Sequence, residues 1–195
     1  MSNHPYRTQP GTYHRARSAL QAQGFDAEVY ALDATDADKV VALIAEIEAS
    51  HRAVDVLHYN AASLRKATLA VQPVETFNSD LAVNIGGAMA AAQAVMATMS
   101  ARQSGSILLT DGTLGINPSP GHLSLSIGKA GIRALTLGLF DATKEKGVHV
   151  ATVTVGAYYV QLDSGEASEI AEEFWKLHIQ KDNWTAETIY SPSAE

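Results

Sequence analysis

The 195-residue chain contains no cysteine, which excludes disulfide bonds and thiolate chemistry. That absence fits a reducing compartment, and we expect a cytoplasmic location. The chain also lacks an excess of positive charge, because 14 Lys and Arg residues stand against 21 Asp and Glu residues, for a net charge of -7. Binding to a nucleic-acid backbone needs clustered Lys and Arg, so we do not expect nucleic acid as a partner.

Long apolar runs are equally scarce. Residues 1–18 contain none, so we expect no secretory signal. Residues 82–99 are uncharged but consist mostly of Ala and Gly, interrupted by Asn84, Gln93 and Thr98. This low apolar content favours a buried helix over a membrane span, and no membrane partner is expected. The seven histidines show no metal-binding spacing such as H-E-x-x-H, so we predict no metal site.

From residue 27 onward, short apolar runs alternate with segments of helical periodicity. Strands are expected at 27–33, 53–61, 106–110, 148–155 and 184–190. Helices are expected at 13–23, 38–50, 74–102, from about 123 to 146, and 164–180. Gly24 should end the first helix, and Thr35 or Asp36 should cap the second. Residues 111–121 are rich in Gly, Pro and Asn and should form a loop.

Strands without strict polar alternation, separated by helices, predict a parallel sheet covered on both faces. The expected fold class is therefore α/β, a three-layer, Rossmann-like, doubly wound parallel sheet. We expect residues 1–26 to form a polar segment and a helix, and residues 27–195 to form the single domain.

Dinucleotide-binding folds place a glycine-rich turn between their first strand and first helix, where backbone N–H groups meet the pyrophosphate. No such turn precedes the strand expected at 27–33. The pair Gly86-Gly87 lies within the long helix and follows no strand. We interpret it as a site of close helix packing rather than of phosphate contact.

Four motifs nevertheless occur in a distinctive order: Asp33 in "ALDATD", "YNAAS" at 59–63, Asn84 in "LAVNIGGAM" and Lys129 in "SIGKAGIRAL". Together they resemble the short-chain dehydrogenase/reductase family over about residues 13–190. The final segments, "IAEEFWKLH" and "WTAETIY", resemble one atypical branch of that family.

The resemblance implies an NAD- or NADP-dependent oxidoreductase that moves hydride between nicotinamide and a carbonyl or alcohol. It implies that Lys129 holds the nicotinamide ribose and that Asn84 anchors a relay water, which makes these two the catalytic candidates. The cofactor-binding residues that it implies are Asp33, near the adenine, with Asn60, Ala61, Ala62 and Lys129. It also implies a homodimer or homotetramer built through the long helix and the Lys129 helix.

The sequence departs from the family pattern at the reacting centre. By spacing, Leu125 stands where the family has its catalytic tyrosine and Gly112 where it has its serine, and neither side chain can donate a proton. Val155 replaces a proline in the turn after the strand at 148–155. His122, Ser124, Ser126, Tyr158 and Tyr159 are expected near the same cleft and are candidates for a replacement acid. Asp111 could pair with Lys129, although we interpret it as a turn residue.

The family's first two strands, first helix and glycine turn have no counterpart, so the domain is expected to be N-terminally truncated. An apolar sheet edge left open favours aggregation. We therefore expect 27–33 to pair with 54–58, which a right-handed crossover permits, giving about five parallel strands. Three interpretations stay open: an oxidoreductase with weak or altered activity, a catalytically silent α/β scaffold or interaction module, and a fragment of a longer enzyme with a misassigned start.

Overall fold

The computed structural model describes residues 10–156 and 165–191, and the chain divides into two compact units, Met1–Asp33 and Ala34–Glu195. The first unit contains helix α1 (Pro10–Ala22). Gly24, with a φ of 87°, ends it as predicted, because its left-handed conformation lets Phe25 N–H bond back to the carbonyl oxygen of Leu20. The predicted domain boundary after residue 26 stays a prediction.

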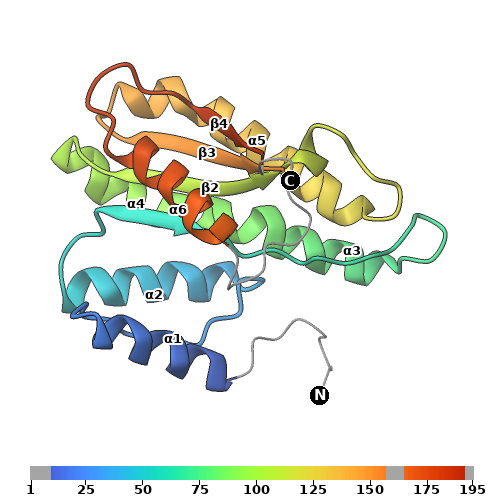
Figure 1. Cartoon of the computed structure of the whole chain (residues 1–195), viewed down its shortest axis with the longest axis horizontal. Coiled ribbons are helices and arrows are strands. Elements are labelled where there is room, and N and C mark those ends of the chain that lie inside the picture. The colour runs from blue at the N-terminus through green and yellow to red at the C-terminus, as the bar shows by residue number, and fades with distance from the viewer. Residues whose placement is uncertain (1–9, 157–164, 192–195) are drawn as a thin grey trace. The chain divides into compact units, whose positions relative to one another are not determined.

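The second unit is built on a parallel sheet with the strand order β1-β2-β3-β4 (Figure 1). The strands are β1 (Val56–Tyr59), β2 (Ser106–Gly112), β3 (His149–Val155) and β4 (Glu187–Tyr190). β1 ends at Tyr59, opposite Leu109 in the middle of β2, and β2 and β3 end together with Gly112 opposite Val155. All three pairings are parallel, so side chains from the ends of different strands gather at one edge of the sheet.

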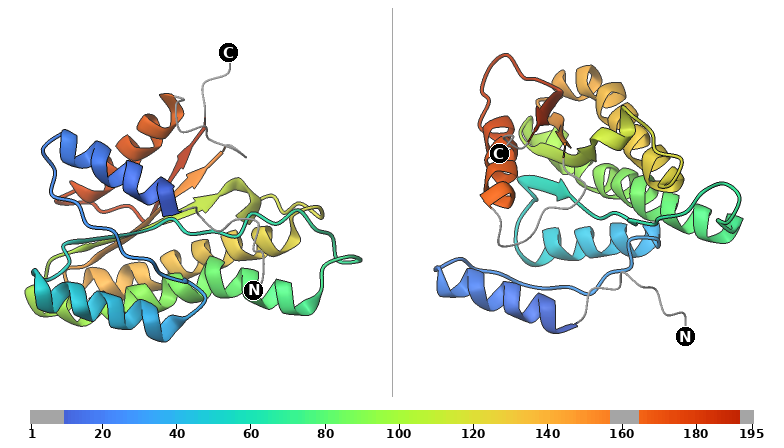
Figure 2. Two further views of the ribbon diagram at one scale, coloured as in Figure 1. Left: turned by 90° about the horizontal axis from the view of Figure 1, so that it is seen from below. Right: turned by 45° about the vertical axis from the view of Figure 1, so that its right-hand side comes forward.

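Helices cover both faces of this sheet (Figure 2). They are α2 (Ala37–Ser50), α3 (Val74–Leu81), a π-helical segment (Ala82–Gly86), α4 (Gly87–Arg102), α5 (Leu123–Lys144) and α6 (Gly165–His178). Helices α4 and α5 pack on one face, α2 packs against α4, and α6 lies on the opposite face. Asp36 caps α2 by accepting a hydrogen bond from Lys39 N–H at 3.1 Å. This three-layer parallel α/β architecture confirms the predicted fold class.

The prediction of a fifth strand is wrong, because residues 27–33 form no strand. A strand needs a neighbour whose backbone satisfies its N–H and C=O groups, and the ladders of the described sheet join only β1 to β4. The apolar composition of residues 27–33 predicted a strand but does not determine whether a partner strand pairs with it. The side chains of Val29, Tyr30 and Leu32 each keep more than a third of their surface exposed.

Small and apolar side chains of α4 form the core against the sheet. Ala88, Val95 and Met99 are fully buried there with Ile107 and Leu109 of β2. The helical stretches 74–102 and 123–144 are long and apolar enough to cross a membrane. In the structure, 39% and 33% of these two apolar stretches are buried inside the domain.

Close packing also explains why one residue of the Gly86-Gly87 pair is glycine. A Cβ on Gly87 would overlap the Tyr59 hydroxyl and the carbonyl oxygen of Ala34, whereas a Cβ on Gly86 would meet only one atom, at 3.9 Å. The packing interpretation therefore holds for Gly87, although its close neighbour is β1 rather than another helix. The Tyr59 hydroxyl in turn donates to the carbonyl oxygen of Val83 in the π-helical segment.

Candidate active site

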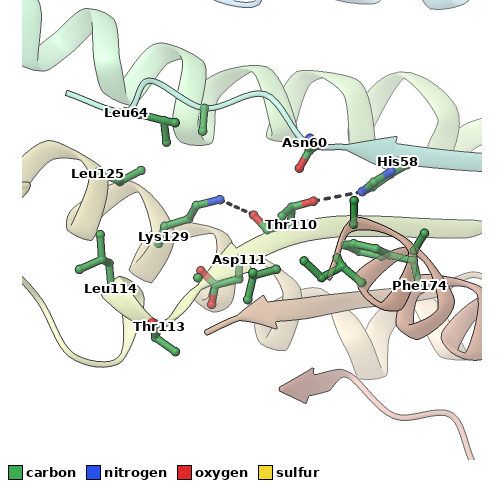
Figure 3. A pocket seen from close by; sticks show the side chains of 16 residues that line it. His58, Asn60, Leu64, Thr110, Asp111, Thr113, Leu114, Leu125, Lys129 and Phe174 are labelled. Carbon is green, nitrogen blue, oxygen red and sulfur yellow. Dashed lines mark hydrogen bonds between the residues drawn. The ribbon is translucent and has the colours of Figure 1, made fainter. Parts of the chain in front are cut away.

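A cavity of about 480 Å³ lies at the carboxyl ends of β1, β2 and β3, beside α6 (Figure 3). Its polar lining residues are His58, Asn60, Thr110, Asp111, Thr113 and Lys129. Most of the remaining lining is apolar and comes from Leu64, Leu114, Leu125, Val155, Ile170 and Phe174, with small residues between them. This is the edge where parallel α/β sheets bind their ligands.

Lys129 extends from α5 toward the end of β2 (Figure 3). Its Nζ donates a hydrogen bond to the carbonyl oxygen of Thr110 at 2.6 Å. Burial lowers the pKa of Lys129, and the nearby charge of Asp111 opposes that shift. A Cβ on Gly112 would be in ordinary van der Waals contact with the Lys129 side chain, 3.8 Å from its Cε.

Asp111 lies within β2 and is only 1% exposed. The interpretation of Asp111 as a turn residue is wrong, because β2 continues through Gly112 and pairs Asp111 with Thr154 of β3. The Thr154 hydroxyl donates to Asp111 Oδ2 at 3.2 Å, while Oδ1 is buried without a hydrogen-bond partner. Burial raises the pKa of Asp111 to about 6, against the opposing effects of the Gly112 N–H, Lys129 and Thr154.

A polar chain continues from Asp111 away from the cavity. The Thr154 hydroxyl lies 2.8 Å from Glu187 Oε1. Arg133 binds both oxygens of Glu187, with Nε at 2.8 Å and Nη2 at 2.9 Å, and it is the main reason that the pKa of Glu187 is lowered. The sequence did not predict this chain, because its members come from α5 and three different strands.

The segment after β1 forms another wall of the cavity. Asn60 and Ala62 line it, whereas Ala61 is exposed and does not. The backbone N–H of Ser63 donates to Asn84 Oδ1 at 2.6 Å, and the Ser63 hydroxyl donates to Asp80 Oδ1 at 2.6 Å. Asn84 and Asp80 therefore position the loop that carries Asn60 and Ala62.

Asp80 is fully buried and also binds side chains from two further regions. Arg65 Nε donates to it at 2.8 Å, Gln72 Nε2 at 2.9 Å and the Ser124 hydroxyl at 2.8 Å. Burial alone would raise the pKa of Asp80, but the hydrogen bonds and the Arg65 charge outweigh it and lower the pKa. In the sequence, the signal for this group is a carboxylate one helical turn before Asn84, and that spacing is too common in helices to predict a buried cluster.

The predicted site residues are only partly brought together. Lys129, Asn60 and Ala62 share the cavity, whereas Asn84 is buried and does not line it. Asp33 belongs to the other unit, so its predicted contact with adenine stays a prediction.

None of the residues predicted as a replacement acid is found in the cavity lining: three lie at other positions, and two lie outside the residues that the structure describes. Ser124 binds Asp80, Ser126 donates to the His122 carbonyl oxygen at 2.9 Å, and neither they nor His122 line the cavity. Tyr158 and Tyr159 lie outside the described residues. Among the residues that the structure describes, no group of three His, Asp or Glu side chains could hold a metal ion.

A family model described as short chain dehydrogenase matches residues 6–170. The chain belongs to the short-chain dehydrogenase family. Within that family it is similar to 3-oxoacyl-[acyl-carrier-protein] reductase FabG of Staphylococcus aureus, with 25% identity over 154 residues, or 79% of this chain and 63% of the relative. It is also similar to 2-dehydro-3-deoxy-D-gluconate 5-dehydrogenase of Pseudoalteromonas atlantica, with 26% identity over 76% of this chain and 58% of the relative. The chain thus spans less than two thirds of the length of these curated relatives.

Solved structures of short-chain dehydrogenases share the fold. A metagenomic short-chain oxidoreductase in complex with NADP has a TM-score of 0.86 at 22% identity, covering 96% of this chain and 83% of that one. A gluconate 5-dehydrogenase from Burkholderia cenocepacia, in complex with NADP and tartrate, has a TM-score of 0.71 at 26% identity, covering 87% of this chain and 66% of that one. The predicted family is confirmed, while the roles of individual residues in this short-chain dehydrogenase stay predictions.

Proposed function

We propose that this chain is an NAD- or NADP-dependent oxidoreductase that acts on a carbonyl or alcohol substrate. The main support is the placement of Lys129, which shares one cavity with Asn60 and Ala62 at the carboxyl ends of the parallel strands. The two similar structures that contain NADP support a nicotinamide nucleotide as the cofactor. When bound, the nicotinamide supplies or accepts hydride.

The residues present fit the nicotinamide half of such a cofactor. The cavity offers an apolar wall for a flat ring, and Lys129 offers an ammonium group for ribose hydroxyls. Ala62 and Gly112 keep the approach to Lys129 free of large side chains. The described residues contain no glycine-rich strand-turn-helix for the pyrophosphate, so we expect weak nucleotide binding.

We propose Asn84 as a positioning residue of this site, because its side-chain oxygen fixes Ser63 directly after the cavity loop. Leu125 lines the cavity at the position of the family's tyrosine. A positioned acid contributes about 10²–10⁴-fold to rate, so we expect turnover well below that of family members with the tyrosine.

Nucleotide-dependent thermal stabilisation of the purified chain tests this proposal. Ligand at about 100 times Kd stabilises by about 2.7 kcal/mol, which raises the Tm of a domain of this size by several degrees. Lys129→Met should abolish the rise, and Lys146→Met is the matched control because Lys146 is exposed in the turn after α5. A cooperative melt that no nicotinamide nucleotide shifts would contradict the proposal and favour a silent scaffold or a fragment.

We also propose a homodimer or homotetramer in which α4 and α5 meet their symmetry mates. Exposed apolar side chains on these helices, Met89, Ile127 and Leu137, support this arrangement. Size-exclusion chromatography with light scattering would give the mass directly. A monomer of 20.7 kDa at micromolar concentration would contradict it.

A further inference from the structure

Most polar side chains of the cavity are already engaged within the protein. His58 Nε2 lies 3.0 Å from the Thr110 hydroxyl, and Lys129 Nζ donates to the Thr110 carbonyl oxygen at 2.6 Å. Asp111 is only 1% exposed and so offers a bound molecule almost no surface. The polar groups of the lining therefore bind mainly to one another rather than to a ligand.

A few hydrogen-bonding groups of the lining remain for a ligand. Asn60 is exposed, Thr113 is partly exposed, and neither side chain has a hydrogen bond to another residue that the structure describes. Lys129 is also partly exposed, and its bond to Thr110 uses one of the three N–H donors of the ammonium. These groups are enough for one substrate oxygen and the ribose of a nucleotide, but not for a row of hydroxyls.

This shortage of partners restricts the ligands that the cavity can bury. A hydroxyl or carboxylate that enters without a hydrogen-bond partner loses its hydration with nothing to replace it. Lys129 is the only Lys or Arg among the described lining residues, and the nearby charge of Asp111 partly offsets its own. The cavity therefore disfavours a substrate with several hydroxyls or with a carboxylate.

Apolar side chains lie on both sides of the Lys129 ammonium (Figure 3). Leu64, Leu114 and Leu125 lie on one side, and Phe174 of α6 lies on the other. Leu125 also places an apolar group where the family has its tyrosine. A substrate with an apolar body would bury that body between these two walls, and the burial would favour binding.

Helix α6 brings its apolar stripe from the core into the cavity. Phe174 and Leu177 pack with Leu108 and Val153 of the sheet. Ile170, one turn before Phe174, packs against this cluster but stays partly exposed and lines the cavity. Ile170 is therefore a member of the stripe that a ligand can contact, and a change there alters the cavity surface more than the core.

We propose that the substrate of this site is an uncharged carbonyl compound or alcohol that carries one reacting oxygen on an apolar body, such as an aromatic aldehyde, and that Ile170 determines this preference. This inference rests on the proposed oxidoreductase function. Asn60 and Thr113 supply hydrogen bonds to the reacting oxygen, and the apolar body lies between the leucines and α6.

The first test measures ligand binding to the full chain without nucleotide. In ¹H–¹⁵N NMR titrations, benzyl alcohol should shift the amide signals of Leu64, Thr113 and Ile170, because these residues line the cavity. Gluconate at the same concentrations should shift none of them. Ile170→Asn should weaken benzyl alcohol binding by about 10–100-fold. Ile179→Asn, the same change at an exposed isoleucine directly after α6, should leave the affinity unchanged.

The same titrations decide against the inference in a defined way. No shift with benzyl alcohol, or tighter binding of gluconate, would overturn the substrate class. Wild-type affinity in Ile170→Asn would overturn the role of Ile170. If that variant fails to fold, Ala171→Glu replaces it, because Ala171 lines the cavity from an exposed position of α6. The added carboxylate should weaken benzyl alcohol binding by at least about tenfold, and an unchanged affinity would contradict the inference.

The second test compares the reduction of benzaldehyde and of 5-dehydrogluconate by NADPH or NADH. We expect kcat/KM to be at least about tenfold higher for benzaldehyde. Ile170→Asn should raise the KM for benzaldehyde with little change in kcat, because the apolar contact is the same in the ground state and the transition state.

The outcomes separate this inference from the proposed function. Turnover that favours the sugar acid would overturn the substrate class and leave the oxidoreductase function standing. Absence of nucleotide binding by the wild type would overturn the proposed function and, with it, the role of the apolar compound as a substrate. The NMR titration would still show which class of ligand the cavity binds.

Discussion

Asp80 and Arg65 form a charge pair in which the carboxylate has no exposure to solvent and Arg65 Nε lies 2.8 Å from its Oδ2. The pair joins the loop after β1 to the helix that leads into Asn84. Ser124, on the first turn of α5, donates to the same carboxylate, so one buried charge connects two walls of the cavity.

Replacing Asp80 by alanine should therefore destabilise the fold strongly. Removing one member of a buried pair typically costs about 3–5 kcal/mol, because the remaining polar groups lose their partner. Urea unfolding would measure the change, with the exposed Asp141→Ala as control. A loss below about 1 kcal/mol would show that water replaces the carboxylate.

The dependence of the free energy of unfolding on acid pH should also reflect the buried Asp80 carboxylate. The pKa of Asp80 is lowered in the folded state, so its contribution is present above about pH 4 and is lost as pH falls toward the folded-state pKa. The stability of Asp80→Asn should consequently decrease less than that of the wild type between pH 5 and 3. Equal slopes for the two proteins would contradict the assignment.

Asp111 should change the stability of the fold with pH in the direction opposite to Asp80. Its folded-state pKa of about 6 lies above the ordinary value of 3.8, so the folded chain binds the proton more tightly than the unfolded chain. Stability is then lost as pH rises from about 4 to 6, by about 3 kcal/mol at about 1.4 kcal/mol per pH unit. Asp111→Asn should be relatively more stable at pH 8 than at pH 4, and denaturant melts at both pH values check this.

Two glycines of α5 should respond oppositely to alanine. A Cβ on Gly128 would lie 2.8 Å from Asn84 Nδ2, closer than packed atoms allow, whereas a Cβ on Gly138 would meet nothing within 4 Å. Gly128→Ala should cost about 1–3 kcal/mol through overpacking, and Gly138→Ala should gain about 0.5–1 kcal/mol through lower backbone entropy in the unfolded chain. Thermal melts of the pair check this, and a stabilising Gly128→Ala would contradict the close approach of α5 to Asn84.

The Tyr59 hydroxyl should stabilise the π-helical segment that leads to Asn84. It donates to the Val83 carbonyl oxygen, and burial raises the pKa of Tyr59 to about 12. Tyr59→Phe should cost about 0.5–1.5 kcal/mol, the usual net value of one hydrogen bond. Amide hydrogen exchange should show faster opening around Val83, and unchanged exchange there would contradict the role.

The class of fold follows from local patterns in the amino-acid sequence. Helical periodicity and short apolar runs are local properties, and they located α2, α5 and the buried strands β2 and β3 within a few residues. The end of α1 at Gly24 and the cap of α2 by Asp36 were also predictable, because each depends on hydrogen bonds between residues close in sequence. Lys129 was recognisable by its spacing within a known motif and lines the cavity, while its role as a cofactor-binding and catalytic residue stays a prediction.

The number of strands and the chemistry of the site depend instead on tertiary packing. The apolar run at 27–33 predicts a strand, yet strand formation depends on a partner that a local pattern does not specify. The Asp80 cluster and the chain from Asp111 to Arg133 join residues that are 8 to 54 positions apart in the sequence. Burial raises the pKa of Asp111 and surrounds Asp80 with donors, and burial is set by which elements pack together.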